Sequence, residues 1–170
     1  MPITGFVGDM GSGKTLYMTI KGYEKARKGH KVLTNYGVMY DHQKLNAARL
    51  EEMGKDLQDC VILGDEFHIV VDSRNSMKGR NKIISYFILQ TRKRGVHLMF
   101  TTQDAGQVDL RLRRMVDYWV HCKRVGTHLF QYTIYKRSGK KVGTVVLDGR
   151  KYYRLYDTRE TITDFGDPED

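Results

Sequence analysis

The sequence predicts an α/β domain with a mostly parallel sheet, flanked by helices and extended by antiparallel strands at its C-terminal end. Two observations carry this prediction. Short apolar runs alternate with helical segments over the first 115 residues, a pattern typical of parallel strands joined by helical crossovers. After about residue 115 the segments are rich in Val, Tyr, Phe and Thr and are separated only by short turns, which favours antiparallel hairpins.

Five elements are expected in the first part of the chain. A strand at Ile3–Val7 runs into a Gly-rich turn, and a helix over 14–28 follows, ended by basic residues and a glycine. A second strand is expected at Lys31–Asn35, and a helix at Asp41–Met53, where an aspartate stands at the N-cap position. Cys60–Gly64 is a continuous apolar run, which is typical of a strand buried on both faces.

The second part of the chain begins with a helix over 80–94, whose apolar residues share one face. A third apolar strand is expected at Val96–Thr101. The antiparallel strands added to this core are expected at Val116–Val125, His128–Lys136, Val142–Leu147 and Lys151–Tyr156.

The charge of the chain is unevenly distributed. It has 29 Lys and Arg against 20 Asp and Glu, a formal net charge of +9. Residues 157–170 hold six acids and one base, so residues 1–156 carry 28 basic and 14 acidic side chains. This favours a polyanionic partner, with nucleic acid first and an anionic membrane surface second. We expect one domain over 1–156, with a core over 1–120 and a β-rich extension over 116–156, followed by an acidic tail.

Composition excludes several classes of protein. Only two cysteines occur, Cys60 and Cys122, which excludes a disulfide framework and indicates a cytoplasm-like compartment. No apolar run reaches the roughly 18 residues that a membrane-spanning helix requires, so no transmembrane segment is expected. The N-terminus lacks the basic and apolar regions of a signal peptide.

The Gly-rich turn matches the phosphate-binding pattern G-x-x-x-x-G-K-[ST] in full, between an expected strand and an expected helix. Its backbone N–H groups and the helix N-terminus would hold the phosphates of ATP. Lys14 would reach the β- and γ-phosphates, and the Thr15 hydroxyl would bind Mg²⁺. The residues of this loop are Gly8, Asp9, Met10, Gly11, Ser12, Gly13, Lys14 and Thr15.

Two adjacent acids, Asp65 and Glu66, follow the apolar strand at Cys60–Gly64. A buried strand seldom ends in two carboxylates, because an unpaired buried charge is costly. Beside the phosphate-binding loop, Asp65 would hold Mg²⁺ through water, and Glu66 could act as general base on an attacking water. The glutamate favours hydrolysis over phosphoryl transfer to a small molecule.

The strand at Val96–Thr101 also leads into polar residues. If it lies between the other two motif strands, Thr101, Thr102 or Gln103 would stand next to the γ-phosphate. Gln103 could hydrogen-bond both the phosphate and the attacking water, as a sensor, although a glutamine that caps the next turn is a competing interpretation.

Basic residues recur from Ser73 through Gln103, where there is no acid, and again at 111–114. Two roles compete for them: an arginine finger inserted into the site of a neighbouring subunit, and contacts with nucleic-acid phosphates. A solvated basic face is the third interpretation.

Five segments in this order resemble the zonular occludens toxin-like and phage assembly ATPases of the FtsK/HerA superfamily. The resemblance covers about residues 1–120, and it implies a P-loop NTPase fold of the RecA/ASCE type with the strand order 5-1-4-3-2 and a ring, usually hexameric. It also implies a sensor at Gln103 and a finger acting in trans at Arg92, after which the finger candidates are Arg94, Arg113 and Arg114. The five segments are Gly8–Thr15, Lys31–Asn35, Leu63–His68, Ser85–Gly95 and Phe100–Asp104.

Three functions are compatible with these motifs, this charge distribution and this resemblance. The first is an ATPase that translocates or packages double-stranded DNA, in the host cytoplasm if the protein is viral. The phage assembly proteins normally carry a transmembrane helix after the ATPase domain, and its lack here favours this function. The second is a virion-assembly or secretion ATPase with a capsid or membrane protein as partner. The third is a small P-loop kinase.

Overall fold

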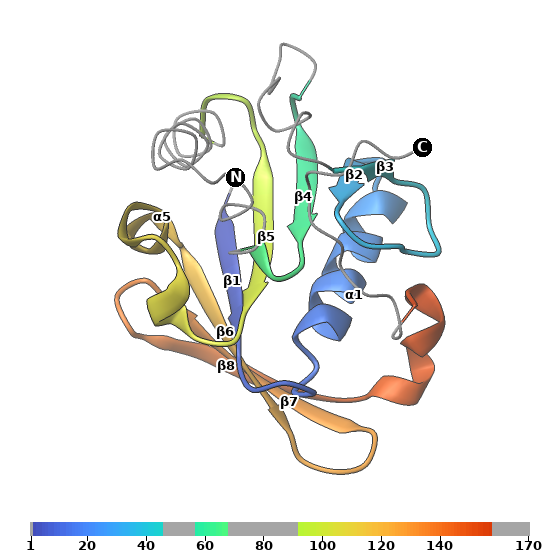
Figure 1. The fold of residues 1–170 in the computed structure, drawn as a ribbon, viewed down its shortest axis with the longest axis vertical. Helices are drawn as coiled ribbons and strands as arrows, with labels where there is room; N and C mark the ends of the chain where they lie inside the picture. The colour runs from blue at the N-terminus through green and yellow to red at the C-terminus, as the bar shows by residue number, and fades with distance from the viewer. Residues whose placement is uncertain (1, 46–56, 68–91, 158–170) are drawn as a thin grey trace.

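Among the described residues, eight strands form one mixed sheet in the order β3-β2-β4-β5-β1-β6-β7-β8 (Figure 1). The computed structural model describes residues 2–45, 57–67 and 92–157. Within them the strands are β1 (Ile3–Val7), β2 (Lys31–Thr34), β3 (Gln43–Lys44), β4 (Cys60–Gly64), β5 (His97–Thr102), β6 (Tyr118–Arg124), β7 (Leu129–Lys136) and β8 (Lys141–Asp148). The helices are α1 (Lys14–Arg27), α5 (Leu110–Met115) and the short 3₁₀ helices η1 (Ala105–Gln107), η2 (Gly149–Lys151) and η3 (Tyr153–Leu155).

The five central strands have the expected order. Numbered along the chain without β3, the strands β6, β1, β5, β4 and β2 stand in the order 5-1-4-3-2. Strand β5 lies between β1 and β4 and is parallel to both. The carboxyl ends of these three strands therefore meet at one edge of the sheet, which we call the carboxyl edge.

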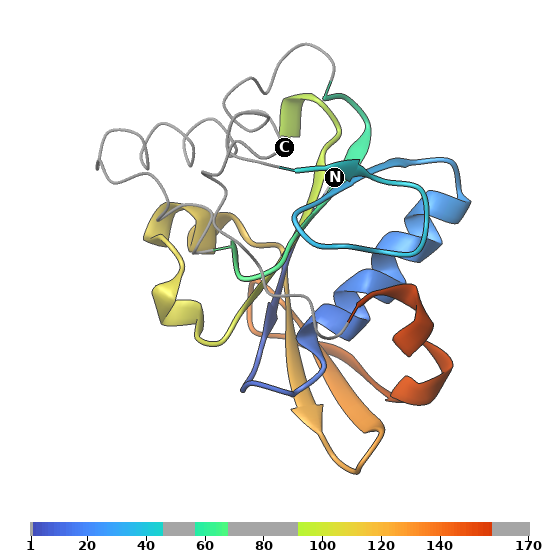
Figure 2. The same ribbon diagram turned by 45° about the vertical axis from the view of Figure 1, so that its right-hand side comes forward.

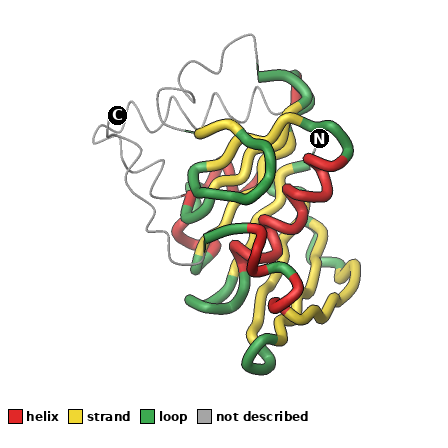
Figure 3. The backbone as a smooth tube through the Cα atoms, turned by 90° about the vertical axis from the view of Figure 1, so that its right-hand side faces the viewer, coloured by secondary structure: helices red, strands yellow, loops and turns green. Residues whose placement is uncertain are grey.

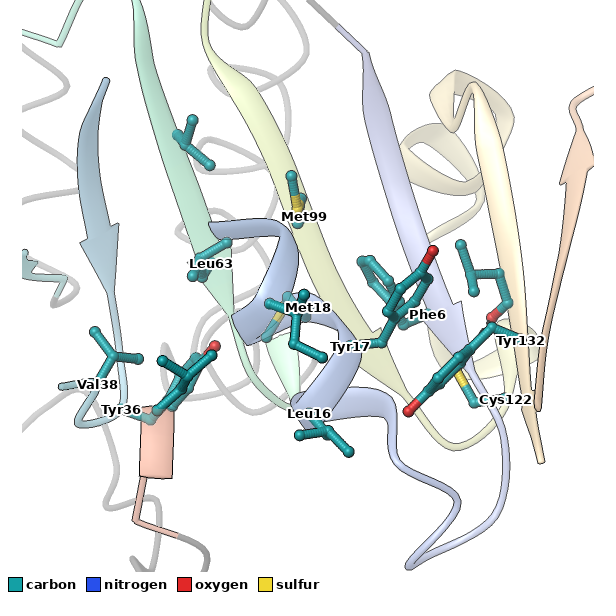
Figure 4. Close-up of a cluster of buried hydrophobic side chains, with 14 of the residues drawn as sticks. Phe6, Leu16, Tyr17, Met18, Tyr36, Val38, Leu63, Met99, Cys122 and Tyr132 are labelled. Carbon is teal, nitrogen blue, oxygen red and sulfur yellow. Dashed lines mark hydrogen bonds between the residues drawn. The ribbon is translucent and has the colours of Figure 1, made fainter. Parts of the chain in front are cut away.

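Each face of the sheet carries its own apolar cluster, because alternate residues of a strand point to opposite faces. Helix α1 covers one face, where Leu16 and Met18 pack with Phe6, Leu63 and Met99 (Figure 4). In Figure 2 η2 and η3 lie beside α1, and in Figure 3 α1 crosses in front of the strands. On the opposite face, side chains from α5 and the segment after it pack on alternate residues of the same strands; this cluster includes Ile3, Ile62, Leu98, Phe100, Leu112 and Val116.

The predicted helix at Asp41–Met53 is wrong over its described part. Residues Gln43–Lys44 form β3, which pairs in parallel with β2. The N–H of Leu45 donates to the Thr34 carbonyl at 2.9 Å, and the Leu45 side chain is buried. Pairing with β2 and burial of this leucine override the local helix signal. Residues 46–53 lie outside the described residues, as do most of the predicted helix at 80–94 and the acidic tail after Asp157.

Two predictions about the C-terminal strands also need correction. Strand β6 is parallel to β1, since η1 and α5 carry the chain back to the amino end of the sheet before it begins; only β7 and β8 are antiparallel to their neighbours. The predicted strand at Lys151–Tyr156 consists instead of η2 and η3. The Asp148 carboxylate caps η2 by accepting from the Arg150 N–H, and Leu155 of η3 packs into the α1 cluster.

Gly5 offers a test of how tightly the centre of the sheet is packed. It pairs with Phe100 on one side and Trp119 on the other. A Cβ at this position would stand 2.5 Å from Trp119 Cζ3 and 3.0 Å from Phe100 Cζ. Gly5→Ala is expected to lower the free energy of unfolding by about 1–3 kcal/mol in chemical denaturation, as overpacking does.

The matched control is Gly143→Ala in β8, where a Cβ would meet no atom within 4 Å. This variant is expected to match or slightly exceed the stability of the wild type, because alanine restricts the unfolded chain more than glycine does. Equal stability of Gly5→Ala and the wild type would contradict the packing described for β1.

Candidate nucleotide-binding site

The predicted phosphate-binding loop joins the carboxyl end of β1 to the N-terminus of α1. Gly11 and Gly13 have φ angles of 76° and 85°, in the left-handed region that glycine adopts at little cost. Gly13 is the N-cap of α1, where no side chain caps the helix and the first turn holds no acid. The first N–H groups of α1 are thus left for an anion, which the helix dipole also attracts.

Lys14 spans this loop. Its ammonium donates to the carbonyls of Gly8 and Asp9, both at 2.8 Å. Burial lowers the pKa of the Lys14 ammonium, against the opposing effect of nearby Cys122, Asp65 and Glu66. A polyanion in the loop would restore favourable surroundings to this cation.

Ser12 provides an independent sign that the loop is built for a polar ligand. Its side chain is 5% exposed, and its hydroxyl has no hydrogen-bond partner within the described part of the chain. A buried polar group without a partner is costly, and a phosphate oxygen is a partner that would satisfy it. The residues present therefore fit a nucleotide phosphate group.

Asp65 stands at the centre of the site. One carboxylate oxygen, Oδ1, accepts from the Thr15 hydroxyl at 2.7 Å and from the Thr101 hydroxyl at 2.6 Å. The first hydroxyl comes from α1 and the second from β5, while Asp65 itself directly follows β4. One carboxylate thus joins three elements at the carboxyl edge.

Asn35 fixes the backbone of Asp65. Its side-chain amide donates to the Asp65 carbonyl and accepts from the Asp65 N–H, both at 2.8 Å. This residue follows β2, so a fourth element is tied to the same acid. The sequence prediction missed it, although a polar residue at the end of an apolar strand is the same signal that identified Gln103.

Glu66 follows in a turn and has a left-handed backbone, with a φ of 46°. That conformation costs a non-glycine residue about 1 kcal/mol. The Glu66 N–H donates to the Thr101 hydroxyl at 2.8 Å, which holds the turn in place. Its carboxylate is close enough to Lys14 to oppose in part the lowering of the pKa of that ammonium by burial. The predicted pair of acids is therefore brought to the phosphate-binding loop.

Asp65 is suited to hold a cation. Burial raises the pKa of its carboxyl, although the hydrogen bonds from Thr101 and Thr15 act in the opposite direction. A bound cation would favour the ionised form. Mg²⁺ in nucleotide sites takes one or two protein oxygens and completes its shell with phosphate and water. Thr15 and Asp65 fit this role, since a hydroxyl and a carboxylate oxygen meet there at 2.7 Å beside the phosphate-binding loop.

Gln103 lies one residue past the end of β5, where Thr102 pairs with Val7 of β1. It therefore lies at the carboxyl edge, and it is exposed. Thr102 is directed elsewhere, since its hydroxyl donates to the Asp104 carbonyl at 2.9 Å. Of the three polar residues predicted here, Thr101 makes the closest connection to the site, through Asp65.

The predicted arginine fingers lie away from this chain's own phosphate-binding loop. Arg92 and Arg94 precede β5, at the amino edge of the sheet, and Arg113 and Arg114 lie in the last turn of α5. The Arg92 guanidinium is half exposed and stands 3.5 Å from Asp117. It borders an open groove of about 990 Å³, lined by Pro2, Arg92, Asp117, Tyr118, Lys136, Arg137 and Ser138.

Tyr132 of β7 is a second residue that the sequence prediction missed. Its hydroxyl donates to the Gly13 carbonyl at 2.9 Å, and its buried ring stacks on Tyr17 with 4.1 Å between centroids (Figure 4). The antiparallel extension thus holds the last glycine of the loop. No sequence signal marks this tyrosine, because the contact joins residues 119 positions apart.

The fold and the site are those of a P-loop NTPase. The phosphate-binding loop follows β1, the two acids follow β4, and β5 lies between these strands with Thr101 bonded to Asp65. The comparisons with known proteins agree with this class.

A family model described as zonular occludens toxin (Zot) matches residues 38–152. The chain therefore belongs to the zonular occludens toxin family, which confirms the resemblance found in the sequence. No curated protein matches the sequence.

Three solved structures show the same fold. The N-terminal domain of zonular occludens toxin from Neisseria meningitidis is 19% identical, with a TM-score of 0.69, and the match covers 92% of this chain and 98% of that one. B204, the DNA-packaging ATPase from Sulfolobus Turreted Icosahedral Virus, is 12% identical, with a TM-score of 0.59 and coverage of 85% and 96%. The pCW3 conjugation coupling protein TcpA is 13% identical, with a TM-score of 0.58 and coverage of 89% and 62%.

In the part of the chain that the structure describes, no helix has the length and apolar character needed to cross a membrane.

The raised pKa of Asp65 predicts an effect on stability. The folded state binds the proton of this acid more tightly than the unfolded state, so its contribution to stability is full below about pH 4 and is lost as the pH rises through the raised pKa. Without nucleotide, Asp65→Asn is expected to be more stable than the wild type at pH 7, with the gain absent at pH 3. Chemical denaturation at both values measures this.

Asp109→Asn provides a control of opposite sign. Its neighbour Arg111 lowers the pKa of Asp109, so this carboxylate contributes stability above about pH 4 that is lost as the pH falls. Asp109→Asn is expected to be less stable than the wild type at pH 7. If Asp65→Asn were instead less stable than the wild type at pH 7, burial would not disfavour the ionised carboxylate of Asp65, which would contradict the account of this site.

Proposed function

We propose that the protein is an ATP-hydrolysing motor that acts on double-stranded DNA. The observation that carries the ATPase part is the bonding of Asp65 to both Thr15 and Thr101, at the end of a complete phosphate-binding loop. Membership of the zonular occludens toxin family and the fold of P-loop ATPases support the same function.

Binding would begin at the phosphates. The backbone N–H groups of Gly8–Thr15 and the N-terminus of α1 would surround the β-phosphate. The Lys14 ammonium would exchange the carbonyls of Gly8 and Asp9 for β- and γ-phosphate oxygens. The Ser12 hydroxyl would gain the partner that it lacks among the described residues.

Hydrolysis would be carried by Glu66. Its carboxylate would take a proton from a water that attacks the γ-phosphorus in line with the departing ADP oxygen. Mg²⁺, held by Thr15 and Asp65, would neutralise charge on the phosphate oxygens when bound. Gln103, exposed at the carboxyl edge one residue past β5, would sense the γ-phosphate and orient the same water.

A neighbouring subunit would complete the site. The described arginines predicted as fingers lie far from their own loop, so each could act only in trans. Arg92 suits this role because half of its side chain is exposed at the amino edge. An arginine in trans stabilises transition-state charge and couples hydrolysis to the assembly. We propose that this assembly is a hexameric ring, as the family pattern implies.

Charge supports DNA as the substrate of the motor. Residues 1–156 carry twice as many basic as acidic side chains, which suits the phosphate backbone of DNA and needs no base reading. One structure with the same fold is named a DNA-packaging ATPase. Packaging of a viral genome is the specific form of this function that we propose.

Glu66→Gln tests the general base. The variant is expected to bind ATP with wild-type affinity and to hydrolyse it about 10²–10⁴-fold more slowly, as loss of a general base does. Phosphate release and ATP titration measure the two properties. Glu24→Gln, an exposed glutamate paired with Lys21, is the matched control and should leave both unchanged. If Glu66→Gln hydrolyses ATP at the wild-type rate, Glu66 is not the general base.

Double-stranded DNA is expected to raise the ATP turnover of the wild type, with an effect that falls steeply as salt rises. Turnover with DNA, with anionic lipid vesicles and with neither, over a salt series, checks this. Stimulation by vesicles but not DNA would support the assembly or secretion ATPase instead. Phosphate transfer to a nucleoside monophosphate would support the kinase.

A further inference from the structure

Strand β6 extends past the beginning of the phosphate-binding loop. It is parallel to β1 and pairs with it up to Val7 and His121. A Cβ on Gly8 would stand 2.5 Å from the Cys122 carbonyl oxygen, so the loop and β6 lie side by side. Three more residues carry β6 about 10 Å beyond β1, at the carboxyl edge, and end at Arg124.

The returning strand brings aromatic side chains to the loop. Phe130 of β7 pairs with Arg124. A Cβ on Gly13 would stand 2.6 Å from Phe130 Cδ1, so this ring packs against the last glycine before Lys14. Gly149 packs against another part of the Phe130 ring and against the Tyr153 ring, since a Cβ on Gly149 would stand 2.8 Å from Phe130 Cε2 and 2.8 Å from Tyr153 Cε1.

Arg124, Phe130, Gly149 and Tyr153 thus form one packed group beside the N-terminus of α1, which we call the hairpin wall; Phe130 and Gly149 are buried in it, and Arg124 is exposed. His128 connects two of these residues: its carbonyl accepts from the Gly149 N–H at 2.7 Å, and its Nδ1 lies 3.3 Å from the Tyr153 hydroxyl. The wall is built from segments distant in the sequence, and it lies outside the residues already assigned to the phosphates.

The Arg124 guanidinium is fixed in position yet exposed. Its Nε donates to the Gly126 carbonyl at 3.1 Å and its Nη2 to the Thr127 carbonyl at 2.6 Å. Its Cζ stands over the Phe130 ring, 6.0 Å from the centroid. A planar cation that is held by two carbonyls, packed on an aromatic ring and open to solvent offers a stacking surface for another planar group.

We propose that the hairpin wall binds the base of the nucleotide, with the Arg124 guanidinium stacked on the base. This inference rests on the proposed function, because it places the base of a nucleoside triphosphate whose phosphates occupy Gly8–Thr15. The loop, Lys14 and Ser12 would bind the phosphates, and the wall offers the exposed, planar guanidinium of Arg124 instead. A purine base is the planar part of ATP that remains to be placed.

The test compares ATP with inorganic tripolyphosphate, which has phosphates but no base, by titration calorimetry of the full chain with Mg²⁺. Arg124→Ala is expected to weaken ATP binding about tenfold, the order of a lost stacking contact, and to leave tripolyphosphate binding unchanged. Arg124→Lys keeps the positive charge but lacks the planar guanidinium. It should therefore also weaken the binding of ATP and leave the binding of tripolyphosphate unchanged.

Arg111→Ala is the matched control, because this exposed arginine of α5 pairs with Asp109 on the other face of the sheet. It should bind both ligands as the wild type does. Equal weakening of ATP and tripolyphosphate in Arg124→Ala would assign Arg124 to the phosphates and overturn the proposal, as would unchanged binding of both.

The two proposals fail differently in this experiment. If the wild type binds neither ligand, the proposed ATPase function fails and the base site fails with it. If the wild type binds both and Arg124→Ala shows no selective loss for ATP, only the base site fails. Circular dichroism checks folding, and Arg124→Lys decides the question if Arg124→Ala does not fold.

Discussion

The carboxylate of Asp65 is the constraint on which the site depends. It is buried where β4 ends, and its Oδ1 accepts hydrogen bonds from the hydroxyl groups of Thr15 of α1 and Thr101 of β5. Asn35, after β2, holds the backbone of the same residue from the other side. Four elements thus converge on one acid whose ionised form is disfavoured by burial. Such a site is costly for the apo protein, and a metal-bound nucleotide would relieve that cost.

The second constraint is the contact between the antiparallel extension and the loop. Tyr132 donates to the Gly13 carbonyl and stacks on Tyr17, while Phe130 packs against Gly13 itself. The C-terminal third of the chain therefore shapes the phosphate-binding loop as well as extending the sheet.

The local parts of this arrangement were predictable from the sequence. The loop over Gly8–Thr15 and the pair Asp65 and Glu66 follow apolar strands, and the carboxyl ends of parallel strands meet at one edge. The order of the five central strands followed from the family resemblance. The site's two donors to Asp65 were both predicted as polar residues near the phosphates, although Thr101 was not distinguished from its neighbours.

The parts that were missed depend on contacts between distant segments. The helix signal at Asp41–Met53 gave way to pairing of Gln43–Lys44 with β2, because tertiary pairing outweighs a weak local preference. Tyr132 carries no motif, and its partner Gly13 lies at the other end of the chain. The prediction made β6 antiparallel to the core, because its composition indicates a strand but does not indicate which strand it pairs with or in which direction.

The most direct test of the central claim is the effect of Mg²⁺ on ATP affinity, measured by titration in the wild type and in Asp65→Asn. If Asp65 holds the metal at the phosphates, Mg²⁺ will tighten ATP binding to the wild type and will have little effect on the variant. The same Mg²⁺ effect in both proteins would contradict the account.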